Sequence, residues 1–161
     1  MININENTSL NEFKELLKQE IKKIELNDLY NLSYHFNEDS KYLPNTYKEE
    51  YRDSVLNVII KRFNLLKNDN KYYEGILNSD NKRLILKLLE ENEDKSRYIL
   101  NIVSVYSIIF LKEPIHPVET IFPGNFRILK KGKSYYCPVK KYHINNKNSL
   151  CKYCIAKKIE E

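Results

Sequence analysis

Residues 98–111 have the sequence YILNIVSVYSIIFL, and this stretch constrains the fold more strongly than any other. Its apolar side chains occupy nearly every direction around a helix, so a helix formed here needs neighbours on all sides. Its β-branched residues would also suit a buried strand, but the run is longer than most strands, and Asp94 can cap a helix. The stretch therefore predicts the central helix of a helical bundle.

Amphipathic patterns before this stretch predict the helices that surround it. Apolar residues at three- and four-residue spacing indicate helices at about 10–25, from about 28 to 36, from about 47 to 66, and from about 80 to 89. Each begins near a residue that can cap it. The predicted caps are Ser9 and Thr46, each in a Ser/Thr-x-x-Glu capping box, Asn27 or Asp28, and Ser79 or Asp80.

The last third of the chain has a different composition, with four of the five prolines and two of the three glycines. Residues 126–129 and 134–137 predict a small β-hairpin, and residues 150–159 predict a short closing helix. We therefore expect a mainly α protein in which residues 1–111 form a helical bundle. Residues 112–161 are expected to form a loop-rich, hairpin-containing tail that packs on it.

The overall composition excludes several classes of protein. Hydrophobic residues make up 42% of the chain, which excludes a fully disordered protein. Only 3 glycines are present, which argues against glycine-rich phosphate loops and a turn-dense β-sandwich. The chain begins without the pattern of a signal peptide, has no apolar stretch long enough to span a membrane, and has an odd number of cysteines. These features predict a soluble cytoplasmic protein that is not inserted in a membrane.

Positive charge is concentrated in the tail. Residues 1–111 contain 16 Lys and Arg against 18 Asp and Glu, whereas residues 112–161 contain 11 against 4, giving net charges of −2 and +7. Such a segment is typical of a solubilising surface and also of a face that binds nucleic acid or another polyanion. Lysines beside tyrosines, as at residues 141–142, can support stacking on bases. Nucleic acid is therefore the partner that the basic tail suggests, although no base-reading motif is present.

The tail also contains every cysteine, at Cys137, Cys151 and Cys154. Two thiolates in a Cys-x-x-Cys turn can chelate one metal ion, and Cys137 can supply a third ligand. His116 and His143 are both available as the fourth, and residue types alone do not separate them. Zinc suits a mixed Cys and His set, and with Zn–S bonds of about 2.3 Å the sulfurs should lie about 3.5 to 4 Å apart.

Three other interpretations of the cysteines stay open. Free thiols are common in protein cores, and a Cys-x-x-Cys pair can be redox-active, although no βαβ unit precedes this one. An iron–sulfur cluster is also compatible, but it usually takes four thiolates. The lone His35 is more typical of an ordinary structural residue, and the sequence has no catalytic-triad, P-loop or HExxH motif.

Three motifs in the tail carry a family resemblance: HPVETIFPGNF at residues 116–126, YYCPVK at 135–140 and LCKYC at 150–154. Their order resembles that of an uncharacterised archaeal family, known mainly from methanogens, whose members typically end in HPVGxxFPGGF, YYCPVK and LCxFC. Glu119, Asn125 and Tyr153 depart from this pattern, whereas the cysteines and His116 match it. The resemblance implies an archaeal cytoplasmic protein, favours His116 as the fourth ligand, strengthens the iron–sulfur alternative and assigns no activity.

Together these patterns predict a binding or interaction module with a structural zinc site formed by Cys137, Cys151, Cys154 and His116. Four protein ligands leave no coordination position for a catalytic water. The alternative is an iron–sulfur redox protein or a metal-dependent enzyme that uses the same Cys and His residues. The sequence does not specify a substrate or an oligomeric state.

Overall fold

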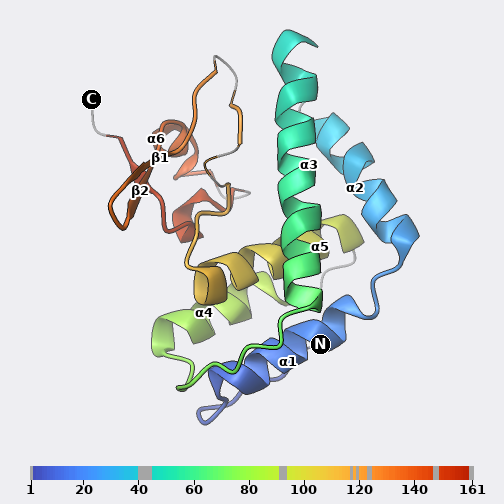
Figure 1. Ribbon diagram of the computed structural model, residues 1–161, viewed down its shortest axis with the longest axis vertical. Helices are drawn as coiled ribbons and strands as arrows, with labels where there is room; N and C mark the ends of the chain where they lie inside the picture. The colour runs from blue at the N-terminus through green and yellow to red at the C-terminus, as the bar shows by residue number, and fades with distance from the viewer. Residues whose placement is uncertain are drawn as a thin grey trace.

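The computed structural model is mainly helical, as the sequence predicted, and its small sheet has a third strand in addition to the predicted hairpin (Figure 1). Among the described residues no helix is both long and apolar enough to cross a membrane. The structure describes residues 2–39, 45–90, 94–116, 118, 120–122, 125–146 and 149–159. The side chains of residues 35–39 and 45–47 are not part of this description. The predicted Thr46 cap and the His35 side chain therefore lie outside this description. The long helices are α1 (Leu10–Ile21), α2 (Leu26–Asp39), α3 (Asn45–Lys67), α4 (Ser79–Leu88) and α5 (Lys95–Tyr106), and α5 continues as a π-helix, η1 (Ser107–Leu111).

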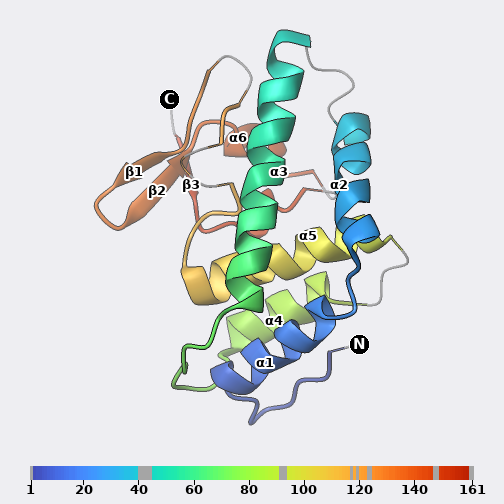
Figure 2. The same ribbon diagram turned by 45° about the vertical axis from the view of Figure 1, so that its right-hand side comes forward.

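Helix α5 lies at the centre of the helical part and contacts α1, α2, α3 and α4. Figures 1 and 2 show α3 crossing α5, with α1 and α4 below α5 and α1 near the lower end of α3. The side chains of Ile99, Ile102 and Val105 are at most 1% exposed. Since burying one such side chain contributes about 1.5 to 3 kcal/mol, coverage of α5 is a major source of stability. The predicted central helix is confirmed.

Two of the predicted helix caps are present, and one lies a residue earlier than expected. The Ser9 hydroxyl accepts the backbone N–H of Glu12 at 3.0 Å. The Asp94 carboxylate accepts backbone N–H groups of the first turn of α5. Helix α4, however, is capped by Asn78 and not by Ser79 or Asp80. Asn78 is the last residue with extended backbone before the helix, which is the conformation that a cap requires.

The boundary between α1 and α2 also differs from the prediction. Helix α1 ends at Ile21 and does not continue to residue 25. Asp28 does not precede α2 as its cap, because its carboxylate reaches back to accept the backbone N–H of Glu25 at 2.9 Å. This is the second half of a capping box, and it allows α2 to begin at Leu26.

A buried polar network joins the loop after α3 to α1 and α5. One carboxylate oxygen of Asp69 accepts hydrogen bonds from the hydroxyls of Tyr73 at 2.7 Å and Tyr106 at 2.6 Å. The other oxygen accepts the backbone N–H of Lys71, whose carbonyl accepts the ammonium of the buried Lys14. Burial raises the pKa of Asp69, but these hydrogen bonds together with the Lys14 charge outweigh it and lower the pKa. Asp69 is therefore held as a carboxylate.

The tail folds around the short strands β1 (Leu129–Lys131), β2 (Ser134–Cys137) and β3 (Lys157–Lys158). Strands β1 and β2 form the predicted hairpin, although β1 lies later than the predicted 126–129. Gly132, with φ of 61°, starts the two-residue turn between them, where a primed turn needs a positive φ. Strand β3 pairs parallel to β2.

The closing helix predicted at 150–159 is wrong. Only a single 3₁₀ turn, η2 (Cys151–Tyr153), forms there, and a one-turn helix, α6 (Lys140–His143), precedes it. The Lys140 ammonium donates to the carbonyls of Cys154 at 2.9 Å and Ala156 at 2.6 Å. These bonds hold the chain extended where a helix would have used the same carbonyls.

Tyr106 is the buried donor of the Asp69 network and the residue best suited to test it. The Tyr106→Phe substitution should lower the free energy of unfolding by about 1.5 to 3 kcal/mol, the range for hydrogen bonds to charged groups. Tyr72→Phe is the control because Tyr72 is 74% exposed, and it should change stability by less than about 0.5 kcal/mol. Urea denaturation followed by circular dichroism measures both, and equal values would contradict the role of the network.

The lowered pKa of Asp69 also predicts a pH dependence. Its ionisation stabilises the fold fully above the unfolded-state pKa of about 3.9, and this contribution is lost as pH falls through the lower folded-state pKa. Asp69→Asn should therefore be destabilised most at neutral pH, and its deficit relative to the wild type should shrink below about pH 4. Denaturant titrations from neutral to acid pH measure the difference, and a constant deficit would contradict the assignment.

Candidate metal centre

The segment that carries His116 is held against α3 by a buried arginine. The backbone leaves η1 through Lys112, whose φ is 53°, and then turns toward α3. Arg62 of α3 is 3% exposed and donates to the carbonyl of Ile115 at 2.7 Å and to the carboxylate of Glu113 at 3.2 Å. These two contacts fix the start of the tail on the helical part.

The His116 ring packs between the helical part and the tail. It lies edge-on to Phe122, with ring centroids 5.4 Å apart, and 6.5 Å from the ring of Tyr51 on α3. Burial, followed by the charges of Arg62 and His143, lowers the pKa of His116 to about 4. The imidazole is therefore neutral near pH 7, which is the form that binds metal ions.

Cys137 and Cys154 each accept hydrogen bonds from nearby backbone. Cys137, at the end of β2, is 5% exposed and shares a small apolar cluster with Phe122, Ile128 and Ala156. Burial raises the pKa of its thiol, although backbone N–H groups directed at the sulfur partly oppose this effect. The sulfur of Cys154 accepts the N–H of Ile115 at 3.4 Å, directly beside His116.

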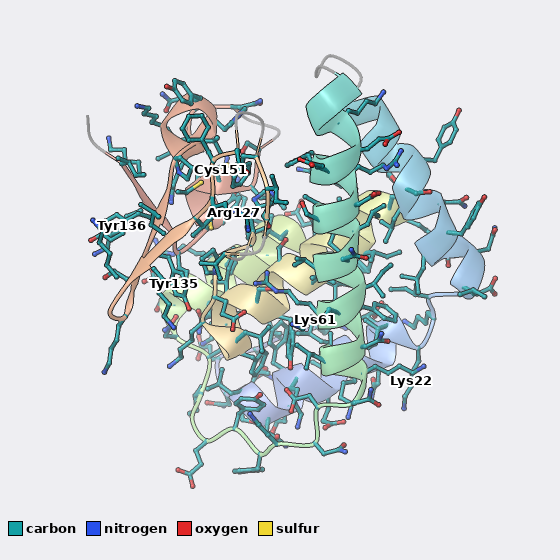
Figure 3. The ribbon with its side chains drawn as sticks, turned by 45° about the horizontal axis from the view of Figure 1, so that its top comes forward. Lys22, Lys61, Arg127, Tyr135, Tyr136 and Cys151 are labelled. Carbon is teal, nitrogen blue, oxygen red and sulfur yellow. The ribbon has the colours of Figure 1, made fainter. Side chains whose placement is uncertain are left out.

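The Cys-x-x-Cys segment forms one tight turn. The N–H of Cys154 donates to the carbonyl of Cys151 at 3.2 Å, which closes the 3₁₀ turn η2. Figure 3 shows Cys151 inside the tail, on the side of α3 opposite to α2. This turn keeps the two cysteine backbones close, as chelation of one ion by both thiolates requires.

A cavity of about 470 Å³ lies between α3, α5 and the tail. Val55 and Ile59 of α3 and Val103 of α5 form part of its apolar wall. All five sequence-predicted ligands line the same cavity. They are His116, Cys137, His143, Cys151 and Cys154.

The five side chains do not form a finished coordination sphere. Among the residues that the structure describes, no group of three or more His, Cys, Asp or Glu side chains is arranged to hold a metal ion. The close approach of the three sulfurs expected from the sequence is thus not seen. Instead, the thiols of Cys137 and Cys154 are directed toward backbone N–H groups.

The cavity also contains polar residues that the sequence analysis did not identify. Arg62 and Thr120 line it, and both are buried. Within the described part of the chain, the Thr120 hydroxyl has no hydrogen-bond partner. A single charge at position 62 in an otherwise apolar helical stripe was the available signal for Arg62, whereas Thr120 has no distinguishing pattern.

The geometry therefore defines a helical protein with a thiol- and imidazole-lined cavity beneath a basic tail. A family model described as an uncharacterized protein conserved in archaea (DUF2115) matches residues 9–159, and the chain belongs to this family. The match confirms the family resemblance predicted from the tail.

Relatives of the chain come from methanogens. The UPF0305 protein of Methanothermobacter thermautotrophicus is 31% identical over 150 residues, covering 88% of this chain and 92% of the relative. UPF0305 protein MJ0646 of Methanocaldococcus jannaschii is 33% identical over 159 residues, covering 93% and 96%. UPF0305 protein MmarC6_0221 of Methanococcus maripaludis is 28% identical, covering 92% and 96%. No solved structure matches the chain.

Arg62 provides a direct test of how the tail is attached. Arg62→Met should lower the free energy of unfolding by about 3 kcal/mol, because it removes the donors to Ile115 and Glu113 from a buried position. The neighbouring Lys61 is exposed on the same helix, so Lys61→Met is the matched control. Limited trypsin digestion followed by mass spectrometry should show earlier cleavage in residues 112–161 only in Arg62→Met. Identical digestion of the two variants would contradict the attachment.

Proposed function

We propose that this protein is a metal-binding module in which zinc, held by Cys137, Cys151, Cys154 and His116, ties the basic tail to the helical part. The observation that supports the proposal is the shared cavity, because residues from three segments of the chain line it. Thiolates and a neutral imidazole are the ligands that zinc favours in structural sites. The donor chemistry therefore fits the ion, and the remaining requirement is a short approach of the sulfurs.

Backbone hydrogen bonds support this donor set. Burial raises the pKa of Cys137, and the backbone N–H groups of Val139 and Lys140 lower it in part, so they favour the thiolate against the larger effect of burial. Cys154 accepts the N–H of Ile115. Such outer contacts orient metal ligands and raise site affinity in known metalloproteins.

His116 is favoured over His143 as the fourth ligand. Its neighbour Ile115 already contacts the sulfur of Cys154, and its ring is held by Tyr51 and Phe122. His143 lies at the end of a one-turn helix, and its side chain is exposed. A ligand whose position is set before binding loses less conformational freedom when the ion binds.

The tail has little hydrophobic core of its own, so a metal ion that connects it to the helical part would stabilise it. Among its described residues, the buried cluster of the tail contains Phe122, Ile128, Cys137 and Ala156, which is a small core for a segment of this length. Loop-rich segments with little core commonly depend on a metal or on disulfides for stability. Bound zinc would supply a closed four-ligand link of that kind, so the site would stabilise and leave no position for catalysis.

The size of the cavity supports one alternative function, that of a redox protein or an enzyme. A space of about 470 Å³ beside the thiols exceeds the need of a single closed zinc site. The same residues would then serve an iron–sulfur redox protein or a metal-dependent enzyme, with three thiolates and an exchangeable position. Colour separates an iron–sulfur cluster from zinc, because a cluster absorbs visible light and zinc does not.

Metal analysis of protein purified without oxygen tests the proposal. We expect about one equivalent of zinc per chain in a colourless preparation, and loss of this zinc in Cys151→Ser/Cys154→Ser. His116→Asn should weaken zinc retention against a competing chelator by about 10- to 100-fold or more, whereas His143→Asn should not. A brown preparation with iron would support the alternative. Absence of stoichiometric metal, with a tail equally protease-resistant after chelation, would refute both.

A further inference from the structure

We propose that the outer face of the three-stranded sheet binds single-stranded nucleic acid, with Tyr136 as the base-stacking residue and Lys131 and Lys157 as phosphate contacts. This inference goes beyond the metal module and concerns the opposite side of the tail. The basic tail suggested nucleic-acid binding in general, and this inference assigns that binding to the outer face of the sheet and to the Tyr136 ring.

The strand register defines this face. Tyr136 lies opposite Leu129 of β1 and opposite Lys157 of β3. Residues directly opposite one another share a face of a sheet, and successive residues alternate between faces. Cys137 is buried on the inner face, so Tyr136 belongs to the outer one. Figure 3 shows Tyr136 on the side of the hairpin away from the helices and Tyr135 on the nearer side.

Tyr136 is flanked by two cations. The ammonium of Lys131 lies 5.7 Å from the ring centroid, and that of Lys157 lies 5.9 Å from it. The two lysines come from the strands on either side of β2, and both are exposed. The contact of an exposed ammonium group with a tyrosine ring is weaker than the stacking of a base on that ring, so a base can displace the ammonium groups toward the phosphates. Leu129, 48% exposed, extends the apolar platform.

The positive charge around this face is not balanced by acidic residues nearby in the sequence. Residues 120–159 contain ten Lys and Arg and no Asp or Glu. Both lysines beside Tyr136 belong to this stretch, as does Lys133 in the exposed turn of the hairpin. A surface with one sign of charge attracts phosphates over several ångströms before contact is made.

The half-buried Tyr136 ring on the outer face favours a single strand over a duplex or an acidic protein as the partner. Bases in a duplex are stacked on one another and cannot reach an aromatic side chain, whereas unpaired bases can stack on it. An acidic peptide would need the lysines alone and would gain nothing from the ring. The dependence of binding on Tyr136 therefore distinguishes these partners.

Fluorescence anisotropy with a labelled single-stranded oligonucleotide tests the proposal on the full chain as purified. Tyr136→Ala should weaken binding by about 5- to 150-fold, the range for loss of one stacked base, and Tyr136→Phe should restore it. Tyr142→Ala is the matched control, because Tyr142 is 72% exposed and has the Lys141 ammonium 5.1 Å from its ring, yet lies on α6 outside the sheet.

Salt dependence tests the lysines separately. Lys131→Gln/Lys157→Gln should reduce the slope of log affinity against log salt by about 1.4, since each phosphate contact of a single strand contributes about 0.7. Lys141→Gln/Lys152→Gln removes the same charge elsewhere in the tail and should reduce the slope less. Metal content and circular dichroism must match the wild type in every variant, so that loss of fold is not taken for loss of binding.

Several outcomes would overturn the inference. One is the absence of binding to single strands even at about 50 mM salt. Others are a duplex that binds as tightly as the single strand, an equal effect of Tyr136→Ala and Tyr142→Ala, or polyglutamate binding that depends equally on Tyr136. Because the metal content is held constant across variants, these failures are distinguishable from failure of the zinc proposal.

Discussion

The burial of α5 on all sides is the constraint on which the rest of the structure depends. A helix with apolar residues around most of its circumference is stable in water only when other helices cover it. Helices α1 to α4 provide that cover, and all of them contact α5. The end of the same helix places Tyr106 against Asp69, and its π-helical continuation ends at the left-handed Lys112, which directs the chain toward the tail. The chain therefore runs from α5 through Lys112 to the tail, and this route places the cavity between α3, α5 and the tail.

The tail depends on the helical part more than on itself. Its buried cluster is small, whereas Arg62 of α3 binds its first segment, and its Leu150 and Tyr153 pack against the main core. Strand β2 then connects the two proposals. Its two-residue period places Cys137 on the inner face, toward the cavity, and the half-buried Tyr136 on the outer face. A metal site and a binding face can therefore occupy the two sides of one short strand without competing for residues.

Local signals predicted the helical part well. The caps at Ser9 and Asp94 were predicted because each depends on backbone groups within three residues of the cap. The closing helix at 150–159 was wrong because the bonds that prevent it come from Lys140, more than ten residues away in the sequence. The Asp69 network was not anticipated either, since Tyr106 contributes to it from a distant helix.

The sequence by itself determined the helical class, the central helix, the excess positive charge of the tail and the set of thiols and imidazoles available as ligands. These properties depend on residue type and on the spacing of residues close together in the chain, and both can be read directly from the sequence. Only the tertiary structure decided that the backbone N–H of Ile115 lies against the sulfur of Cys154, that Thr120 lines the same cavity as the thiols, and that Tyr136 lies on the opposite face of the sheet from Cys137. Each of these results depends on how separate segments pack, and packing is set by contacts between residues far apart in the chain.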